Sequence, residues 1–495
     1  MLTSSLLLLV VINVIYRLFR HYSSKLASIP GPFLARFSRF WLLRETYYGR
    51  FHLKDVELHR KHGPVIRIAP GQYSIDDPNS VQTIYGSKGG FIKSTFYRAT
   101  AVPGRIHENL FADPNTERHA VNRRRISGAY SMTTLVQLEP FINECTDILK
   151  ARLTEFAKAG EAIDLPHWLQ CYAFDVIGNV TLGKRFGFLD KGEDINGIMG
   201  SLEILLYYSA RIGIIPEIHP VLFFANVLLF PSMRGLQHLL DFVDKIVAPR
   251  LKGPLLEKNN TGPSDFITRF RHLQSENPEK VRDRDIMASA LANIGAGSDT
   301  TGISLTAVFY YISKNLKVLD KVRHELEEAS NRGEISTPIK FKEAQQLKYL
   351  QAVLKEALRC HPATGLILGR VVPKGGSTIA GHFFPAGATV GVNAWAAHAN
   401  QDVFGEDADI FRPERWLEAP ELVKQREAYF MTFGSGTRTC LGKNISLLEM
   451  SKVVPEIIRW YDIEPVFPER DIETTNDWFV KQKNFPCRIV RRASQ

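Results

Sequence analysis

Phe433-Gly-Ser-Gly-Thr-Arg-Thr-Cys-Leu-Gly442 is the most specific residue pattern in this chain of 495 residues. Its single cysteine, Cys440, stands among glycines, directly before a stretch with helical spacing that starts at Lys443. A helix N-terminus offers unpaired N–H groups and the positive end of the helix dipole, and Arg438 lies nearby in the sequence. Such surroundings favour a thiolate. We therefore interpret Cys440 as a metal ligand rather than as another buried cysteine.

A thiolate held in this way can be the axial ligand of a haem iron. The spacing F-x-x-G-x-R-x-C-x-G resembles the haem-binding signature of the cytochrome P-450 superfamily of haem-thiolate monooxygenases. This resemblance implies haem b as the cofactor, bound to iron through Cys440, with Phe433, Arg438 and Gly442 in the binding loop. The resemblance extends over nearly the whole chain. The stretches 174–190 and 391–394 favour the microsomal, filamentous-fungal, pisatin demethylase-like members.

Composition narrows the possible partners. The formal net charge is +10, yet no basic run with interleaved aromatic residues appears, so nucleic acid is not expected as a partner. A basic chain suits anionic lipid, an acidic protein partner, or simply a solvated surface. The five cysteines show no paired spacing, which indicates a reducing compartment without a disulfide framework.

The N-terminus predicts a membrane anchor. An apolar stretch of roughly 15 residues, short for a full span, ends near Tyr16 and is followed by Arg17, Arg20 and Lys25. No basic region precedes the stretch, so a retained anchor is favoured over a cleaved signal peptide. The basic flank orients the remainder toward the cytosol. We expect an anchor with its basic flank over 1–28, a catalytic domain over 29–495, and an endoplasmic reticulum location.

The periodicity of the remaining chain predicts a mainly α (α+β) fold, with one large helical domain and small β-sheets. Residues 117–329 show mostly helical spacing, and a hairpin is expected over 64–80 around Pro70-Gly71. Residues 378–393 alternate as strands, with Pro385-Ala-Gly387 as the predicted reversal. The apolar stretch 202–230 is interrupted by Pro216 and Pro220. It is therefore interpreted as a pair of helices, either covering a pocket or dipping into a bilayer surface, or lying in the core.

The sequence Ala296-Gly-Ser-Asp-Thr-Thr301 lies inside a long helical run over 284–314. Glycine permits a flat ligand to approach the backbone, and a threonine hydroxyl can bond to a carbonyl one turn earlier. Asp299 adjoins Thr300, so an acid and a hydroxyl could serve one pocket through a water or a side-chain rotation. The segment matches the A-G-x-D/E-T-T sequence of the superfamily. The resemblance implies that Asp299 and Thr300 are catalytic and deliver protons.

Glu356-Ala-Leu-Arg359 places a carboxylate and a guanidinium on one helix face. The superfamily pairs such a Glu-x-x-Arg motif with the arginine of a P-E-R-F segment, which corresponds here to Arg415. The resemblance implies that these three residues fix the loop before the cysteine. This chain has Trp416 where the superfamily usually has phenylalanine.

Cations are needed to hold haem propionates in a mostly buried site. Arg123 matches the propionate arginine of the family's W-x-x-x-R segment, although His119 replaces the tryptophan. Arg438 is the second candidate, and Arg370 is a third by position only. His119 could still donate a hydrogen bond to a propionate. Basic residues on the cysteine side would also suit docking of an acidic reductase.

The resemblance implies insertion of one oxygen atom from O2 into a lipophilic small molecule, by hydroxylation, O-demethylation or epoxidation. No flavin or nicotinamide fingerprint is evident, so electrons from NADPH would arrive through a separate NADPH-cytochrome reductase. From their positions in the chain, residues 96–111, 363–368 and 476–479 are expected to line the substrate-binding site. Two alternatives stay open: a haem-thiolate isomerase or dehydratase that uses no O2, and a non-catalytic membrane-anchored haem protein.

Overall fold

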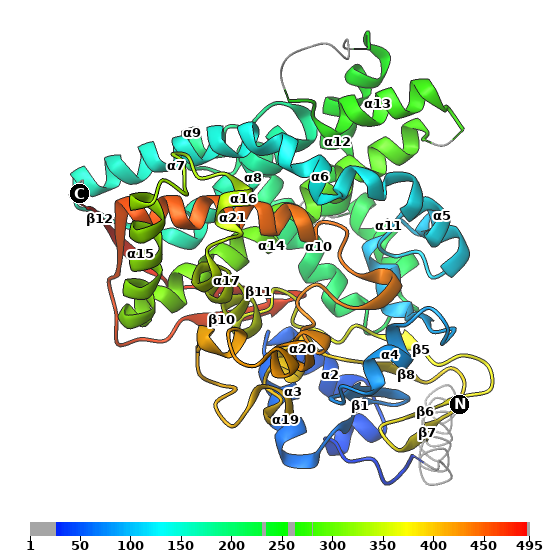
Figure 1. The fold of residues 1–495 in the computed structure, drawn as a ribbon. Helices are drawn as coiled ribbons and strands as arrows, with labels where there is room; N and C mark the ends of the chain where they lie inside the picture. Colours follow the sequence, from blue (N-terminus) through cyan, green and yellow to red (C-terminus); the bar gives the residue numbers. More distant parts are fainter. Residues whose placement is uncertain (1–25, 230–233, 256–262, 280, 493–495) are drawn as a thin grey trace, which may run out of the picture.

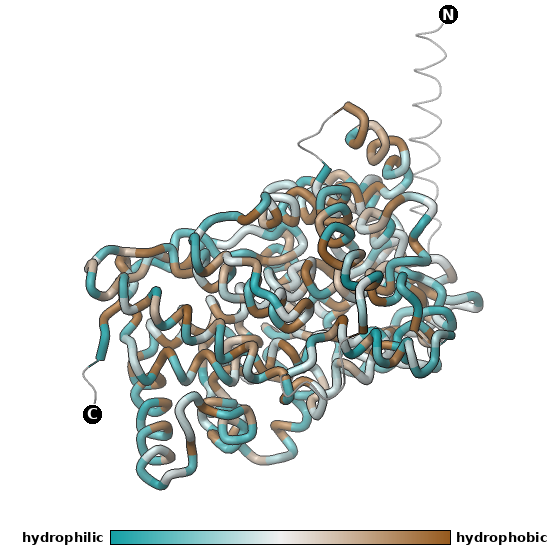
Figure 2. Tube along the Cα trace, turned by 90° about the horizontal axis from the view of Figure 1, so that it is seen from above, coloured by the Kyte–Doolittle hydropathy of each residue, from teal (hydrophilic) through white to brown (hydrophobic). Residues whose placement is uncertain are grey.

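The computed structural model of the protein describes residues 26–229, 234–255, 263–279 and 281–492. Most of these residues are helical, and the strands form small sheets, as the sequence predicts. In Figure 1 the long helices fill the upper and central parts, whereas the largest sheet and the hairpin of β6 and β7 lie at the lower end. The tube in Figure 2 shows hydrophobic residues recurring along the helices between hydrophilic ones, the pattern that lets each helix bury one side.

Two helices, α14 (Asp283–Lys314) and α8 (Leu165–Leu182), pack along each other at the centre of the molecule (Figure 1). Glycines on α14 make this approach possible. A Cβ atom added at Gly297 would stand 3.0 Å from Ile177 Cδ1, and one at Gly302 would stand 3.1 Å from Gln170 Cα. The sequence suggested that glycine here admits a flat ligand. At Gly297 the structure shows contact with another helix instead.

Further long helices surround this pair: α7 (Glu139–Ala159), α12 (Gly235–Lys252), α15 (Leu316–Asn331), α17 (Lys348–Cys360) and α21 (Lys443–Trp460). Helix α7 has Pro140 in its first turn and ends at Gly160, whose φ is 70°. Proline fits the first turn because that N–H has no helical partner, and glycine adopts the left-handed conformation that closes a helix. The shorter helices are α2 (Phe40–Tyr47), α3 (Phe51–His62), α4 (Ser80–Tyr85), α5 (Thr116–Ser127), α6 (Met132–Leu135), α9 (Phe188–Lys191), α13 (Phe266–Glu276), α16 (Phe341–Ala344), α18 (Ala394–His398), α19 (Gln401–Phe404) and α20 (Pro420–Ala428).

The largest sheet has the strand order β1-β2-β8-β5-β3. The predicted hairpin is confirmed, with Gly71 at a φ of 70° between β1 and β2. The predicted reversal at Pro385-Ala-Gly387 is wrong. Strands β6 and β7 turn at Ala380 and Gly381, and the proline segment instead leads from β7 into β8 of the large sheet. The strands of these two sheets are β1 (Val65–Ala69), β2 (Gln72–Ile75), β3 (Ile92–Lys93), β5 (Arg370–Val371), β6 (Ser377–Ile379), β7 (His382–Phe384) and β8 (Thr389–Gly391).

Two further sheets use the C-terminal part of the chain. Strand β10 (Glu473–Asp477) pairs with β11 (Phe479–Lys483), and only Trp478 separates them. Strand β12 (Pro486–Arg491) lies between β4 (Ala162–Asp164) and β9 (Tyr461–Pro465). The β10–β11 hairpin brings the end of the chain back to the central helices, since β11 contacts α14.

The apolar stretch over 202–230 forms α10 (Ile198–Ile212) and α11 (His219–Leu229), separated around Pro216 as predicted. Several side chains of α11 are exposed, including Val221 at 74% and Leu228 at 77%. Within the described ranges, no helix has both the length and the apolar character needed to cross a bilayer. Of the anchor predicted over 1–28, residues 1–25 lie outside the part that the structure describes.

Candidate functional site

The cysteine loop is shaped by glycine. The N–H of Cys440 donates to the carbonyl of Phe433 at 2.8 Å and closes the loop. Gly434 and Gly436 both have a φ of 67°, which other residues seldom adopt. A Cβ atom at Gly436 would stand 1.8 Å from the carbonyl oxygen of Tyr85, so no side chain fits there. The glycines of the motif therefore serve the path of the loop and its contact with α4.

Cys440 lies at the N-terminus of α21, with Gly442 as the residue that caps the helix. Burial raises the pKa of the Cys440 thiol, while N–H groups of Gly442 and Lys443 and the charge of Arg123 lower it. The N–H groups predicted at the helix N-terminus are thus present, and the cation that acts on the sulfur is Arg123 where the sequence suggested Arg438, but burial outweighs these groups. The residue is nevertheless exposed. A thiol in this balance gives up its proton when a metal ion binds the sulfur.

Three arginines that the sequence nominated lie near one another, and one of them is near this cysteine. Arg123 is close enough to Cys440 for their charges to interact, and Arg438 is close to both Arg123 and Arg370. Burial, followed by the charge of Arg370, lowers the pKa of Arg438 to about 10. Both terminal nitrogens of Arg438 are buried without a hydrogen-bond partner among the described residues. Buried guanidinium groups of this kind require an anion, so the cluster fits the paired carboxylates of haem b.

His119 belongs to the same cluster. Its side chain is buried, and burial together with the charges of Arg438, Arg123 and Lys93 lowers its pKa to about 3. The imidazole is therefore neutral near pH 7 and has one N–H to donate. This protonation state agrees with the predicted hydrogen-bonding role of His119 toward a carboxylate.

Lys93 is a member of the cluster that sequence reasoning missed. It is buried on β3 and lies near Arg370, Arg438 and Arg123. A single lysine in a short strand resembles a solvated surface residue, and no motif marks it. Only the pairing of β3 with β5 brings it beside Arg370.

Asp299 and Thr300 turn to different partners. One oxygen of the buried Asp299 accepts from Gln170 of α8 at 2.5 Å, and the other lies 3.2 Å from Nζ of Lys481 on β11. The hydroxyl of Thr300 donates to the carbonyl of Ala296, one turn earlier, at 2.8 Å. The predicted back-bonding is confirmed for Thr300, whereas the hydroxyl of Thr301 donates to the hydroxyl of Ser446 at 3.4 Å. In this arrangement the carboxylate would reach Thr300 only through a side-chain rotation or bridging water.

The Glu-x-x-Arg motif forms a buried network as predicted. The carboxylate of Glu356 receives two hydrogen bonds from Arg359, at 2.9 and 2.8 Å, and one from Arg415 at 2.8 Å. Burial alone would raise the pKa of Glu356, but the two arginines lower it below its ordinary value. The unusual Trp416 also has a role here, because its indole N–H donates to Glu356 at 2.8 Å. Phenylalanine could not make this bond.

The three segments expected to line a substrate wall do meet. The rings of Phe96 and Trp478 are 4.7 Å apart, and those of Phe111 and Trp478 are 5.7 Å apart. The N–H of Gly365 donates to the carbonyl of Trp478 at 3.0 Å. Trp478 has a φ of 87°, an uncommon conformation for a bulky residue, and is held in it by these contacts. We call Phe96, Tyr97, Phe111 and Trp478 the aromatic cluster.

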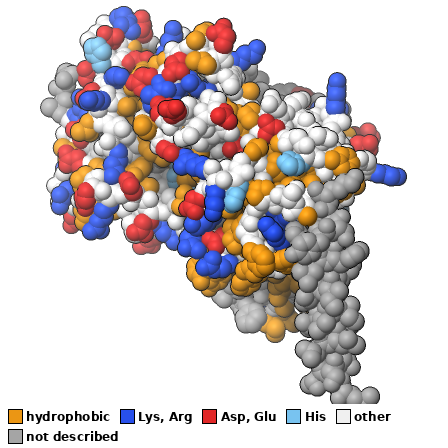
Figure 3. Space-filling model, turned by 90° about the horizontal axis from the view of Figure 1, so that it is seen from below, with side chains coloured by type: hydrophobic (Ala, Val, Ile, Leu, Met, Phe, Trp, Pro, Cys, Tyr) orange, Lys and Arg blue, Asp and Glu red, His pale blue; other side chains and the backbone are white. Residues whose placement is uncertain are grey.

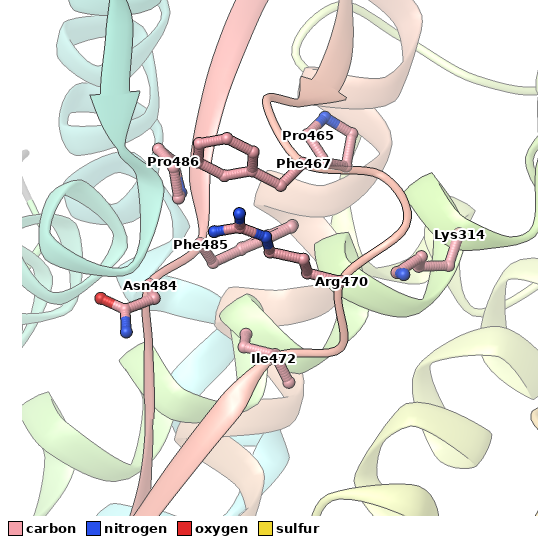
Figure 4. A pocket seen from close by; sticks show the side chains of 8 residues that line it. All are labelled: Lys314, Pro465, Phe467, Arg470, Ile472, Asn484, Phe485 and Pro486. Atoms are coloured by element: carbon pink, nitrogen blue, oxygen red, sulfur yellow. The ribbon is translucent and has the colours of Figure 1, made fainter.

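A small surface hollow lies elsewhere, where the end of α14 meets the C-terminal strands (Figure 4). Its lining includes Lys314, Arg470 and Phe485, and the Arg470 guanidinium lies over the ring of Phe467 at 4.3 Å. None of its lining residues belongs to the cysteine loop, the cation cluster or the aromatic cluster. It therefore adds no group to the site around Cys440.

Comparisons with known proteins agree with this geometry. A family model described as Cytochrome P450 matches residues 30–486. Two proteins named pisatin demethylase from Fusarium vanettenii are 39% and 38% identical, over 96% and 97% of this chain and 90% and 94% of their own lengths. A cytochrome P450 monooxygenase from Emericella nidulans, cicH, is 36% identical over 94% of both chains.

Proposed function

This chain belongs to the cytochrome P450 family, and we propose that its substrate is a lipophilic small molecule which reaches it from a membrane. The protein is a haem-thiolate monooxygenase that uses haem b. One observation carries the residue assignment: Cys440 stands just before α21 and close to Arg123, which neighbours Arg438, and the terminal nitrogens of Arg438 are buried with no hydrogen-bond partner among the described residues. The isomerase, dehydratase and non-catalytic alternatives are not favoured, because the relatives are named as monooxygenases or a demethylase.

Each residue then has a proposed task. Cys440 binds the iron through sulfur, and Arg123, Arg370 and Arg438 bind the carboxylates, with His119 as a hydrogen-bond donor. When bound, the haem activates dioxygen and transfers one oxygen atom to the substrate. Thr300 and Asp299, which both belong to α14, supply protons for the reaction. Gly442 and Phe433 hold the loop so that the sulfur keeps its position.

An uncharged, flat substrate suits the aromatic cluster, since large rings at its edge offer apolar area and stacking faces. Two relatives carry the name pisatin demethylase, and others are monooxygenases of filamentous fungi. O-demethylation or hydroxylation of an aromatic ether is therefore the first reaction to examine, within secondary metabolism or detoxification. Pisatin itself serves as the first probe compound.

The electron donor is proposed to be a separate NADPH-cytochrome reductase. The sequence contains no evident flavin or nicotinamide motif. Helix α5, which carries Arg123, also has the exposed Arg124, and the chain as a whole is basic. A basic surface near the cysteine loop attracts an acidic partner and accelerates its association.

Membrane association is proposed from two apolar regions. Residues 6–16 form the apolar N-terminal stretch, and α11 exposes Val221, Phe224 and Leu228. Figure 3 shows one face of the molecule on which hydrophobic side chains gather over a continuous area. Exposed apolar side chains that gather on a basic protein favour an anionic bilayer surface. The proposed location is the endoplasmic reticulum membrane, with the catalytic domain facing the cytosol.

The function is tested with purified full-length protein, a fungal NADPH-cytochrome reductase, NADPH and isotopically labelled dioxygen. Pisatin and a panel of lipophilic aromatic ethers are the substrates. One labelled oxygen atom should enter a product, or leave with the methyl carbon during demethylation, and the reaction should require the reductase. Turnover of a pre-oxygenated compound without NADPH would favour an isomerase, and absence of any product across the panel would count against an enzyme of this substrate class.

The location is tested by fractionating cells that express the full chain. The protein should sediment with microsomes and resist extraction by alkaline carbonate. The double substitution Leu8→Arg and Val11→Arg, which places charges in the apolar N-terminal stretch, should release it. Recovery of the unaltered chain in the cytosolic fraction would contradict the proposed anchor.

A further inference from the structure

A groove of about 330 Å³ lies between the last turns of α7 and the end of β12, near the C-terminus at the left of Figure 1. Pockets that bind small molecules have volumes of about 300–1,000 Å³, so the groove is large enough for a small ligand. It is remote from Cys440. Helix α21 begins just after the cysteine loop and spans about 27 Å before Tyr461, which pairs with Arg491 at the groove.

The sheet is incomplete at this groove. Strand β4 pairs with β12 only as far as Arg488, whereas β9 pairs with it as far as Arg491. Residues that bond to one neighbour alternate along an antiparallel strand, and the N–H of Arg492 donates to Trp460 on the β9 side. The N–H groups of Ile489 and Arg491 therefore point to the side that β4 leaves open. No described residue accepts a hydrogen bond from either group.

Three cations surround the same groove. Lys158, Arg488 and Arg491 line it, and all three are exposed. None of these side chains forms an ion pair or a hydrogen bond with a described residue. Glu464 stands opposite Arg488 across β9 and β12, yet no ion pair joins them. The lining thus offers positive charge and backbone donors but contains no acid.

Apolar side chains lie between these cations. Ala157 of α7 and Ile489 and Val490 of β12 belong to the lining, and Val490 is 41% exposed. A ligand that matches this arrangement has an acidic group for the cations and N–H donors and an apolar body for the remainder. A peptide strand matches it less well. The open edge, Ile489–Arg491, is shorter than the usual strand of about 5–6 residues.

We infer that this groove binds a small amphipathic carboxylate of the fatty-acid type. Its carboxylate accepts hydrogen bonds from the N–H groups of Ile489 and Arg491 and pairs with the Arg491 and Lys158 side chains, and its chain lies over Ala157 and Val490. A guanidinium suits this role because it binds a carboxylate through two parallel hydrogen bonds. The inference does not depend on the haem assignment, since none of these residues belongs to the site around Cys440.

The test uses decanoate as the probe and isothermal titration calorimetry of the purified full-length holoprotein. Arg491→Gln removes a charge-assisted bond and should weaken binding about tenfold. Val490→Asp, which places an acid beside the ligand, should weaken it at least as much. Lys342→Gln alters an exposed lysine on α16 and should leave the affinity unchanged. Decanol has the same chain without the charge and should bind about tenfold more weakly than decanoate.

The haem absorption spectrum, recorded during the same titrations, separates the groove from the substrate site. Decanoate in the groove should leave the Soret band unchanged. A shifted Soret band together with equal affinities in Arg491→Gln and Lys342→Gln would place the ligand at the haem and overturn the inference. Equal affinities for decanoate and decanol would also overturn it, as would tighter binding of an acidic peptide such as acetyl-Glu-Val-Glu-Val-Glu-amide. If Arg491→Gln gives too little folded protein, Lys158→Gln replaces it, with the same expectations.

Discussion

The carboxylate of Asp299 lies 3.2 Å from the ammonium group of Lys481, which joins the central helix α14 to strand β11. The same ammonium is 3.1 Å from the exposed Glu203 on α10. Burial by itself would lower the pKa of Lys481, but Asp299 and Glu203 raise it above its ordinary value. The lysine thus stays charged between the two acids. Asp299 is held on the side of α14 that faces α8 and β11, away from the bond that Thr300 makes to Ala296.

We predict that Lys481→Met lowers the stability of the protein, because it leaves the buried Asp299 with Gln170 as its remaining partner. Losing the partner of a buried charge costs about 3–5 kcal/mol, and Lys481 is itself partly exposed, so a smaller loss of about 1–3 kcal/mol is expected. Thermal unfolding of the holoprotein measures the change. Lys483→Met is the matched control, since Lys483 is exposed on the same strand. Equal melting temperatures for the two variants would contradict a stabilising role of the ion pair.

Thr300→Ala should retain haem and divert electrons to peroxide. Removal of a proton donor typically lowers a proton-dependent step by about 10²-fold or more, whereas electron supply is untouched. Product formed per NADPH should therefore fall, and peroxide formed per NADPH should rise. Thr306→Ala is the control, because Thr306 donates to the carbonyl of Gly302 through the same backbone bond but is buried further along α14. Unchanged coupling in Thr300→Ala would count against a proton-delivery role.

Cys440→Ala should abolish the reduced carbon monoxide spectrum that is typical of thiolate ligation, together with NADPH-dependent product formation. The reason is that no other sulfur replaces the axial ligand at this place in the loop. Cys487→Ala, which removes a buried thiol on β12, is the control and should keep both properties. A thiolate-type spectrum that persists in Cys440→Ala would mean that the iron is bound elsewhere.

Trp416→Phe should destabilise the protein by about 1–3 kcal/mol, because an oxygen of the buried Glu356 loses a hydrogen bond from the indole N–H. Trp460→Phe offers a contrast, since the indole nitrogen of Trp460 has no hydrogen-bond partner among the described residues. Urea unfolding of the two holoproteins should therefore show a larger loss for Trp416. A similar loss in both would indicate that ring packing, rather than the hydrogen bond, explains the tryptophan.

Acid should weaken the fold partly through His398. Its Nε2 atom accepts from the N–H of Met431 at 2.8 Å, and its Nδ1 atom is 2.9 Å from the carbonyl of Arg359, so the ring is neutral. Burial, aided by the charge of Arg359, lowers its pKa from 6.5 to about 3. As the pH falls, the imidazole of His398 is therefore protonated in the unfolded chain at a higher pH than in the folded protein. The contribution of the neutral His398 to the stability of the fold is complete above pH 6.5 and is lost as the pH falls from 6.5 to about 3.

The expected slope for one such group is at most about 1.4 kcal/mol per pH unit in that window. His398→Gln should reduce the difference in unfolding free energy between pH 7 and pH 5, measured with urea. His324→Gln, which alters an exposed histidine on α15, should leave the difference unchanged. An identical pH dependence in His398→Gln would show that the imidazole does not titrate as its surroundings require.

The sequence predicted a helix correctly where apolar residues recur at helical spacing and residues typical of helix ends stand at its boundaries. The stretch expected to be helical over 284–314 is α14 (Asp283–Lys314), and the helix expected from Lys443 is α21, which starts at that residue. The misplaced reversal at Pro385 has a clear cause. A proline-glycine segment marks a turn, but whether the flanking strands pair with each other depends on partners distant in the chain. Here β8 pairs with β2 and β5 instead.

The sequence by itself determined the helical class and the Glu356 network, and it predicted Cys440 as the ligand, because these depend on residue types at fixed short spacings. The tertiary structure alone decided which cations meet. Lys93 and Arg370 are far apart in the chain and become neighbours only through the pairing of β3 with β5. It also turned Asp299 toward Lys481 and assigned Gly297 to the contact with α8. Electrostatic and packing interactions depend on distances of a few ångströms between side chains. The spacing of residues along the chain does not show which side chains come that close.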